Sequence, residues 1–264
     1  MKNTFLTPKI VSIATAAVAA IAGISSSHAA IVFADSFTLP NDLDTPLIGT
    51  SPVIGGAWTI TGTSVVNPLT ISAASNDVFL NTNGQDANGA FSSPVTKTDG
   101  ESLTVGATID MLTVSAAGDY FLHMSVNALS SNFYGRVYAR TGVATNTYQL
   151  GLASSTPPTG GITWGGDLPI GSAVKIDLTW NFITGALNDT FSLAVTGAPN
   201  YIPATAWVGT AAEPTSIGTV NLRQGTAATA PTLRIDNLLV TAIPEPSTAL
   251  LGAVGLLGLL RRRR

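Results

Sequence analysis

An alternation of apolar and polar residues runs through the interior of this 264-residue chain. It is clearest between 174 and 182, where the apolar members are Val174, Ile176, Leu178, Trp180 and Phe182. Successive side chains of a β-strand point to opposite faces, so a period of two predicts a strand with one buried and one wet face. Trp180 falls on the apolar face and is therefore predicted to lie in the core.

The same pattern recurs along the chain, over 31–37, 103–111, 120–126, 148–152, 191–195 and 233–240. In the last of these, Leu233 and Leu238 have opposite parity, which predicts a bulge near Asp236 and Asn237. Between Ala30 and Ile243 no segment of convincing length has the helical period, and Gly, Pro, Asn and Thr interrupt the strands at short intervals. These features predict an all-β domain, an antiparallel β-sandwich over 30–243.

The N-terminal segment has the three parts of a secretory signal peptide. Lys2 and Lys9 precede an apolar stretch over 10–24, and small residues follow it. Cleavage after Ala29 places Ser27 and Ala29 at the small-residue positions, whereas cleavage after Ala30 would place His28 there. We therefore predict a signal helix over 1–29 and a mature domain outside the inner membrane.

The C-terminal segment over 244–264 combines a rigid break, a short apolar run and a block of positive charge. Pro244, Glu245, Pro246 and Ser247 precede the apolar run over 249–260, and the chain ends in Arg261, Arg262, Arg263 and Arg264. Two prolines hold Glu245 in an extended segment. The run would form a helix of about 18 Å, which is short for a bilayer core of about 30 Å. Arginines cross the membrane at high cost and favour the cytoplasmic side.

This order of elements resembles the PEP-CTERM sorting signal of Gram-negative bacteria. The resemblance implies a transient anchor in the inner membrane and a membrane-embedded exosortase as partner, which recognises the motif, removes the tail and releases or attaches the protein outside the cell. An ordinary tail-anchored helix is the alternative, but it calls for a longer apolar run.

Composition excludes several classes of partner and chemistry. Between Ala30 and Ile243 there are 6 basic and 14 acidic residues, a net charge of −8. An acidic surface repels phosphate backbones, so nucleic acid is not an expected partner. The absence of cysteine from the sequence excludes disulfides and thiol chemistry.

A second resemblance extends over the whole domain. The segments 34–37, 55–58, 175–193, 222–225 and 233–238 are similar to the concanavalin-like jelly rolls of exported PEP-CTERM proteins. The resemblance implies that the first and last strands pair, which would bring Asp35 and Asp236 toward the same edge. The fold carries glucanases, lectins and adhesion modules, so it constrains function only loosely.

Catalysis is not expected. Laminarinase-like members of this fold use Glu-x-Asp-x-x-Glu on one strand, and neither Glu101 nor Glu213 has a carboxylate at that spacing. The only histidine of the mature domain, His123, is predicted to be a solvated strand residue without a nucleophile-elbow sequence. Mononuclear zinc sites need several His or Cys ligands, which the mature domain lacks. No catalytic residue and no cofactor is predicted.

Glycan binding is the open alternative. Tyr134, Arg136, Tyr138 and Arg140 are predicted to share one strand face, where aromatic rings and guanidiniums can bind sugars. The competing interpretation is a face on which tyrosine and arginine pack over one another. Trp164, in a glycine-rich loop, is either an aromatic platform or a loop anchor.

Calcium binding is a further candidate. Asp42 and Asp44 could ligate calcium through their oxygens, but the segment lacks a calcium-loop pattern, and a solvated acidic turn is the alternative.

The sequence therefore predicts an exported, non-catalytic component of the cell surface or of the extracellular polysaccharide or biofilm matrix. A carbohydrate-binding module is the second hypothesis, and a polysaccharide hydrolase with an unfamiliar site is the third.

Overall fold

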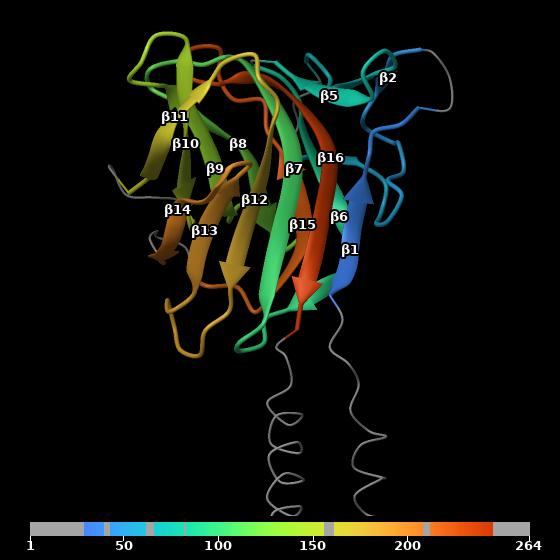
Figure 1. Ribbon diagram of the computed structural model, residues 1–264. Helices are drawn as coiled ribbons and strands as arrows, with labels where there is room; N and C mark the ends of the chain where they lie inside the picture. The colour runs from blue at the N-terminus through green and yellow to red at the C-terminus, as the bar shows by residue number, and fades with distance from the viewer. Residues whose placement is uncertain are drawn as a thin grey trace, which may run out of the picture. The chain divides into compact units, whose positions relative to one another are not determined.

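The computed structural model describes residues 29–39, 43–61, 66–81, 83–155, 161–207 and 212–244. Over these residues the chain forms an antiparallel β-sandwich of two sheets (Figure 1), which confirms the predicted all-β class. The predicted terminal helices lie outside the described residues. The sandwich is one compact unit from Ala29 to Ile243.

The first sheet has nine strands in the order β14-β13-β12-β7-β16-β5-β4-β2, and β1 also pairs with β16. Their bounds are β1 Ala30–Asp35, β2 Thr45–Pro46, β4 Thr70–Ser72, β5 Asp77–Leu80, β7 Ser102–Thr113, β12 Val174–Asn181, β13 Thr190–Val195, β14 Ala198–Ala206 and β16 Thr232–Ile243.

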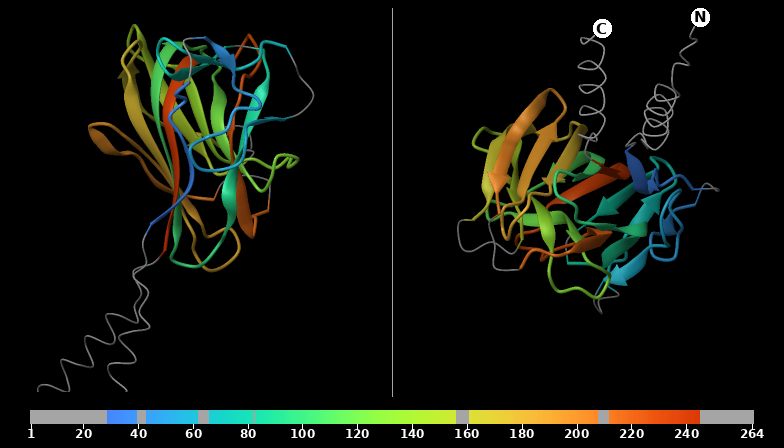
Figure 2. Two further views of the ribbon diagram at one scale, coloured as in Figure 1. Left: turned by 90° about the vertical axis from the view of Figure 1, so that its right-hand side faces the viewer. Right: turned by 90° about the horizontal axis from the view of Figure 1, so that it is seen from below.

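The second sheet has seven strands in the order β11-β10-β9-β8-β15-β6-β3. Their bounds are β3 Thr59–Thr61, β6 Asp86–Thr96, β8 Asp119–Ser125, β9 Tyr134–Thr141, β10 Thr147–Ala153, β11 Thr163–Pro169 and β15 Ser216–Leu222. The two sheets face each other (Figure 2, left).

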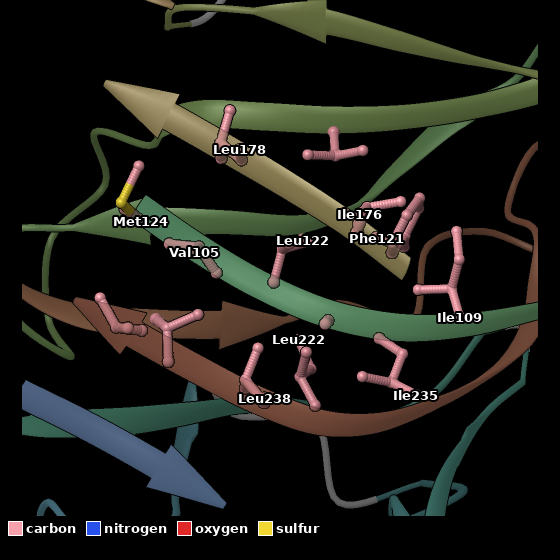
Figure 3. Packing of buried hydrophobic residues seen from close by; sticks show 14 of the residues in the cluster. Val105, Ile109, Phe121, Leu122, Met124, Ile176, Leu178, Leu222, Ile235 and Leu238 are labelled. Atoms are coloured by element: carbon pink, nitrogen blue, oxygen red, sulfur yellow. The ribbon is translucent and has the colours of Figure 1, made fainter. Parts of the chain in front are cut away.

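The core lies between the sheets and is built from the inward members of the alternating patterns. Figure 3 shows side chains from β7, β8, β12, β15 and β16 that meet there. Trp180 is fully buried, as predicted, and its indole Nε1 donates a hydrogen bond of 2.8 Å to Asp189 Oδ2. Burial of these apolar side chains is the main stabilising contribution.

The last strand, β16, is the central strand of the nine-stranded sheet. It pairs with β7 along its length, and its other side pairs first with β5 and then with β1. The predicted pairing of the first and last strands is confirmed, with Asp35 opposite Leu238. The predicted bulge is confirmed too, because the register with β7 shifts between Asp236 and Leu239 and Asn237 has φ of 52°.

A cluster of three charged residues ties together loops at the end of the sandwich where β1 begins and β16 ends. Lys97 Nζ lies 2.8 Å from both Asp189 Oδ2 and Glu213 Oε2. Asp189 is fully buried and also accepts a hydrogen bond of 2.7 Å from the backbone N–H of Ile183. Burial alone would lower the pKa of Lys97, but the hydrogen bonds and charges of Asp189 and Glu213 outweigh it and raise that pKa.

Candidate functional site

The outward side of the seven-stranded sheet carries a set of aromatic and arginine side chains, which we name the aromatic–arginine face. Val137 and Ala139 of β9 point into the core, so Arg136, Tyr138 and Arg140 point outward. Neighbouring strands and loops supply the other members. The face consists of Tyr120, Phe133, Arg136, Tyr138, Arg140, Trp164 and Arg223.

The prediction that Tyr134 belongs to this face is wrong. Tyr134 is buried in the core, where its ring centroid lies 5.8 Å from that of Trp180. The alternation breaks because β9 carries an extra residue opposite β8: Leu122 pairs with Val137, whereas Met124 pairs with Tyr134. Gly135 accommodates the bulge at φ of 57°, and a Cβ there would lie 2.7 Å from the Met124 side chain.

A second bulge corrects the predicted face of β8. Tyr120 pairs with Tyr138 and Leu122 pairs with Val137, so β8 has one residue more than β9 over this stretch. Phe121 and Leu122 are both in the core as a result, while Tyr120 joins the outward cluster. The alternating pattern over 120–126 had predicted that Tyr120, Leu122 and Met124 share one face. This prediction is wrong, because Tyr120 lies outward whereas Leu122 and Met124 lie in the core.

The guanidiniums of the aromatic–arginine face stack on its rings. The Arg136 guanidinium carbon lies 4.5 Å from the centroid of Tyr120, and that of Arg223 lies 4.1 Å from the same ring. Arg140 lies 4.1 Å from the centroid of Trp164. These contacts are cation–π interactions, which stabilise the cluster internally. They match the interpretation in which the side chains pack over one another.

Two carboxylates accompany Arg223 at one side of the face. Arg223 Nη1 lies 2.7 Å from Asp119 Oδ1, and its Nε lies 4.0 Å from Asp86 Oδ2. Burial raises the pKa of Asp86 to about 6, although the hydrogen bond from the Gln224 N–H and the charge of Arg223 act in the opposite direction. The charge of this corner therefore changes in mildly acidic solution.

Arg140 and Trp164 form the opposite, more accessible corner. Arg140 donates hydrogen bonds of 3.0 and 2.8 Å to Gln149 Oε1, and Gln149 Nε2 donates one of 3.0 Å to Asp167 Oδ1. Both Arg140 and Trp164 are half-buried. Trp164 lies on strand β11 and not in a loop as predicted, and a Cβ at Gly151 would lie 2.7 Å from its indole.

Beside this face lies a covered row of polar side chains that sequence reasoning missed. Asn88 Nδ2 donates to Asn221 Oδ1 at 2.7 Å, and Asn221 Nδ2 donates to Ser125 Oγ at 3.1 Å. All three side chains are buried although they lie on the outward side of the sheet. An alternating sequence pattern identifies these side chains as outward-facing, but it does not indicate that other residues of the protein bury them.

His123 lies next to this row and is not the solvated residue that the sequence predicted. Its side chain is 1% exposed, and its ring centroid lies 4.3 Å from that of Phe133. Burial lowers the pKa of His123 well below its usual value, and the charges of Arg136 and Arg223 lower it further. Neither ring nitrogen has a hydrogen-bond partner among the described residues.

Only one of the two calcium candidates lies among the described residues. Asp42 lies outside the described residues, and Asp44 Oδ1 accepts a hydrogen bond of 2.9 Å from the N–H of Ala73. Within the described ranges no group of three or more His, Cys, Asp or Glu residues is placed to hold a metal ion. Calcium binding by Asp42 and Asp44 stays a prediction.

The ends of the sandwich meet the predicted targeting segments. Ala30 is the first residue of β1, and Pro244 follows the last residue of β16. The remaining residues of the predicted sorting signal, from Glu245 to Arg264, and those of the predicted signal peptide before Ala29 lie outside the described residues. The described segments include no helix that is long and apolar enough to cross a membrane.

Residues 242–264 match the PEP-CTERM protein-sorting motif. The tail is a PEP-CTERM sorting motif. This confirms the interpretation of the C-terminal segment and extends the motif upstream to Ala242 and Ile243. The motif implies processing by an exosortase, and export with a transient membrane anchor in a Gram-negative bacterium. None of the curated proteins matches the sequence.

Solved structures that resemble the sandwich include jelly-roll lectin-like and glucanase-like domains. An endo-1,3-beta-glucanase from Streptomyces sioyaensis is 14% identical, with a TM-score of 0.44 over 83% of this chain and 98% of that one. The lectin UEA-II, solved with galactose, is 12% identical, with a TM-score of 0.43 over 83% and 100%. The CBM2 module of an evolved Dit protein from Lactobacillus casei BL23 phage J-1 is 9% identical, with a TM-score of 0.46 over 83% and 98%. Likenesses this distant say nothing about the ligand or activity of this chain.

Proposed function

We propose that this protein is an exported, non-catalytic component of the cell surface or extracellular polysaccharide matrix, which its PEP-CTERM motif delivers there. The observation that carries the proposal is that the sorting motif directly continues the central strand of the sandwich. The delivered cargo is thus the β-domain itself.

The environments of the few candidate catalytic groups support a non-catalytic role. Glu213 is engaged with Lys97 in the buried charge cluster, and His123 is enclosed by Tyr120 and Phe133. A general acid or base must come within hydrogen-bonding distance of the substrate. Neither group is placed for that. A screen of polysaccharides for hydrolysis tests this part of the proposal, and product formation would contradict it.

Changing Glu245 to Ala should leave export through the inner membrane intact but retain an unprocessed, membrane-associated form. The glutamate lies between the two prolines of the motif, the segment that an exosortase is proposed to read. Cell fractionation and immunoblotting in cells with and without exosortase measure the outcome. Glu101→Ala, at a glutamate outside the motif, is the matched control. Normal maturation of the Glu245→Ala variant would contradict the proposed sorting.

A second candidate function, binding of acidic polysaccharide, is favoured by the Arg140 and Trp164 corner. The domain carries a net charge of −8, yet three of its six basic residues, Arg136, Arg140 and Arg223, lie on the aromatic–arginine face. Arg136 and Tyr138 are each 7% exposed, so the more accessible Arg140 and Trp164 would make the contacts. A guanidinium can bind a uronate or sulfate group while the indole stacks on a sugar ring.

Arg140→Ala should therefore weaken retention on the producer's own exopolysaccharide, and the difference from the parent should shrink as salt is added. The Debye length falls to about 3 Å at 1 M salt, which screens a guanidinium–carboxylate attraction. Arg234→Ala is the control, because Arg234 is, like Arg140, a half-buried arginine, but it lies on the other sheet. Isothermal titration of the parent domain with that exopolysaccharide decides the question. If no heat of binding is measured, only the structural role remains.

A further inference from the structure

The sorting motif and the central strand of the sandwich share residues. The motif match begins at Ala242, whereas β16 ends at Ile243. Ala242 pairs with Leu103 of β7 on one side and with Ala30 of β1 on the other, and Ile243 pairs with Ser102. The first motif residues are therefore engaged in the sheet when the domain is folded. Figure 1 shows β1 and β16 side by side at this end of the sandwich.

An enzyme that reads the motif from Ala242 onward would compete with the sheet for the same backbone groups. Proteins that read an extended peptide form hydrogen bonds to its backbone N–H and C=O groups. In β16 these groups already pair with β7, and in part with β1. Only Pro244 separates Ile243 from Glu245. A single residue spans at most about 3.6 Å, so an enzyme bound to the motif must approach the folded end of the sheet closely.

The geometry points to a gate: the PEP-CTERM motif is processed only when the last residues of β16, 241–243, detach from β1 and β7. This inference rests on the proposed processing of the tail by an exosortase. Strand ends open locally at much lower free energy than the whole domain, so such fraying can occur in a folded protein. The folded sandwich would thereby set the rate at which the tail is removed.

A disulfide between β7 and β16 tests the gate. Thr104 and Thr241 are directly paired, and paired antiparallel residues have Cα atoms about 4.5–5.5 Å apart, within the range that a disulfide accepts. The chain has no cysteine, so Thr104→Cys/Thr241→Cys can form one disulfide only, in the oxidising compartment outside the inner membrane. Thr108→Cys/Lys175→Cys, a directly paired set on β7 and β12, is the matched control.

The measurement is a pulse-chase of the full chain in cells that contain exosortase, with the fraction of disulfide scored by thiol labelling. Locking the end of β16 should slow tail removal by about tenfold or more, because local opening is blocked. The control disulfide should leave the rate unchanged, and a reducing agent should restore processing of the locked variant. Equal rates for the locked and control variants would overturn the gate.

An independent variant covers the case in which the disulfide disturbs folding. A six-residue Gly/Ser insertion between Thr241 and Ala242 adds up to about 20 Å of reach and leaves the matched motif over 242–264 uninterrupted. It should speed up tail removal severalfold and should rescue the locked variant. An unchanged rate in the parent background would overturn the gate. If the parent itself is never processed, the proposed sorting fails, and Glu245→Ala then has no effect either.

Discussion

Trp180→Ala is expected to lower the free energy of unfolding by about 3–5 kcal/mol, as truncation of a large aromatic side chain in a core does. The indole is fully buried, and its centroid lies 4.7 Å from that of Phe191 and 5.4 Å from that of Phe182. The truncation leaves a cavity and also removes the indole donor to buried Asp189. Because domains are stable by about 5–15 kcal/mol, this is a large share of the total.

Urea denaturation of the domain over 30–243 measures this loss. Trp180→Phe separates packing from hydrogen bonding, and it should cost about 1–3 kcal/mol, since Asp189 then loses one buried partner. Leu129→Ala is the surface control, because Leu129 is 95% exposed and its loss should change stability by less than about 0.5 kcal/mol. An unchanged midpoint for Trp180→Ala would show that β12 turns its other face to the core.

Lys97→Met is expected to destabilise the domain by about 3–5 kcal/mol, because breaking a buried ion pair leaves an uncompensated charge. Its ammonium lies 2.8 Å from carboxylate oxygens of both Asp189 and Glu213, and Asp189 is fully buried. The pKa of Lys97 is raised in the folded protein. Its stabilising effect is therefore fully present below the usual lysine value of 10.5 and is lost as the pH rises through the folded-state pKa above it.

Two further observations test this account of the charge cluster. The triple variant Lys97→Met/Asp189→Asn/Glu213→Gln removes all three charges and should recover part of the lost stability. Lys175→Met is the control, since its ion pair with Asp177 is exposed. Equal losses for Lys97→Met and Lys175→Met would contradict the proposed role of the cluster.

Local patterns predicted the elements of the fold because the two faces of a strand appear in its own sequence as an alternation of apolar and polar residues. The alternation around Trp180 placed β12 and its buried face correctly, and the parity change near Asp236 located the bulge of β16. The C-terminal sorting motif could be predicted from the sequence for a related reason. A sorting motif is a linear signal whose parts are recognised in sequence order, so it needs no tertiary contact to be identified.

The two bulges between β8 and β9 were not predicted from the sequence, and they changed the candidate site. One extra residue at Gly135 turns Tyr134 into the core, and another near Phe121 turns Tyr120 outward. A bulge is defined by the register between two strands, and β8 and β9 lack the change of parity that located the bulge of β16. The aromatic–arginine face therefore gained Tyr120 and lost Tyr134, while Phe133 and Arg223 joined it from segments outside the strands.

By itself, then, the sequence determined an exported all-β sandwich with a C-terminal sorting motif, because period and motif are local properties of the chain. Only the tertiary structure decided which side chains are covered: the burial of His123, and the meeting of Lys97, Asp189 and Glu213 from three distant segments. It also showed that the sorting motif begins inside the central strand. Burial and long-range charge pairing depend on residues far apart in the sequence, and their contacts exist only once the strands have assembled.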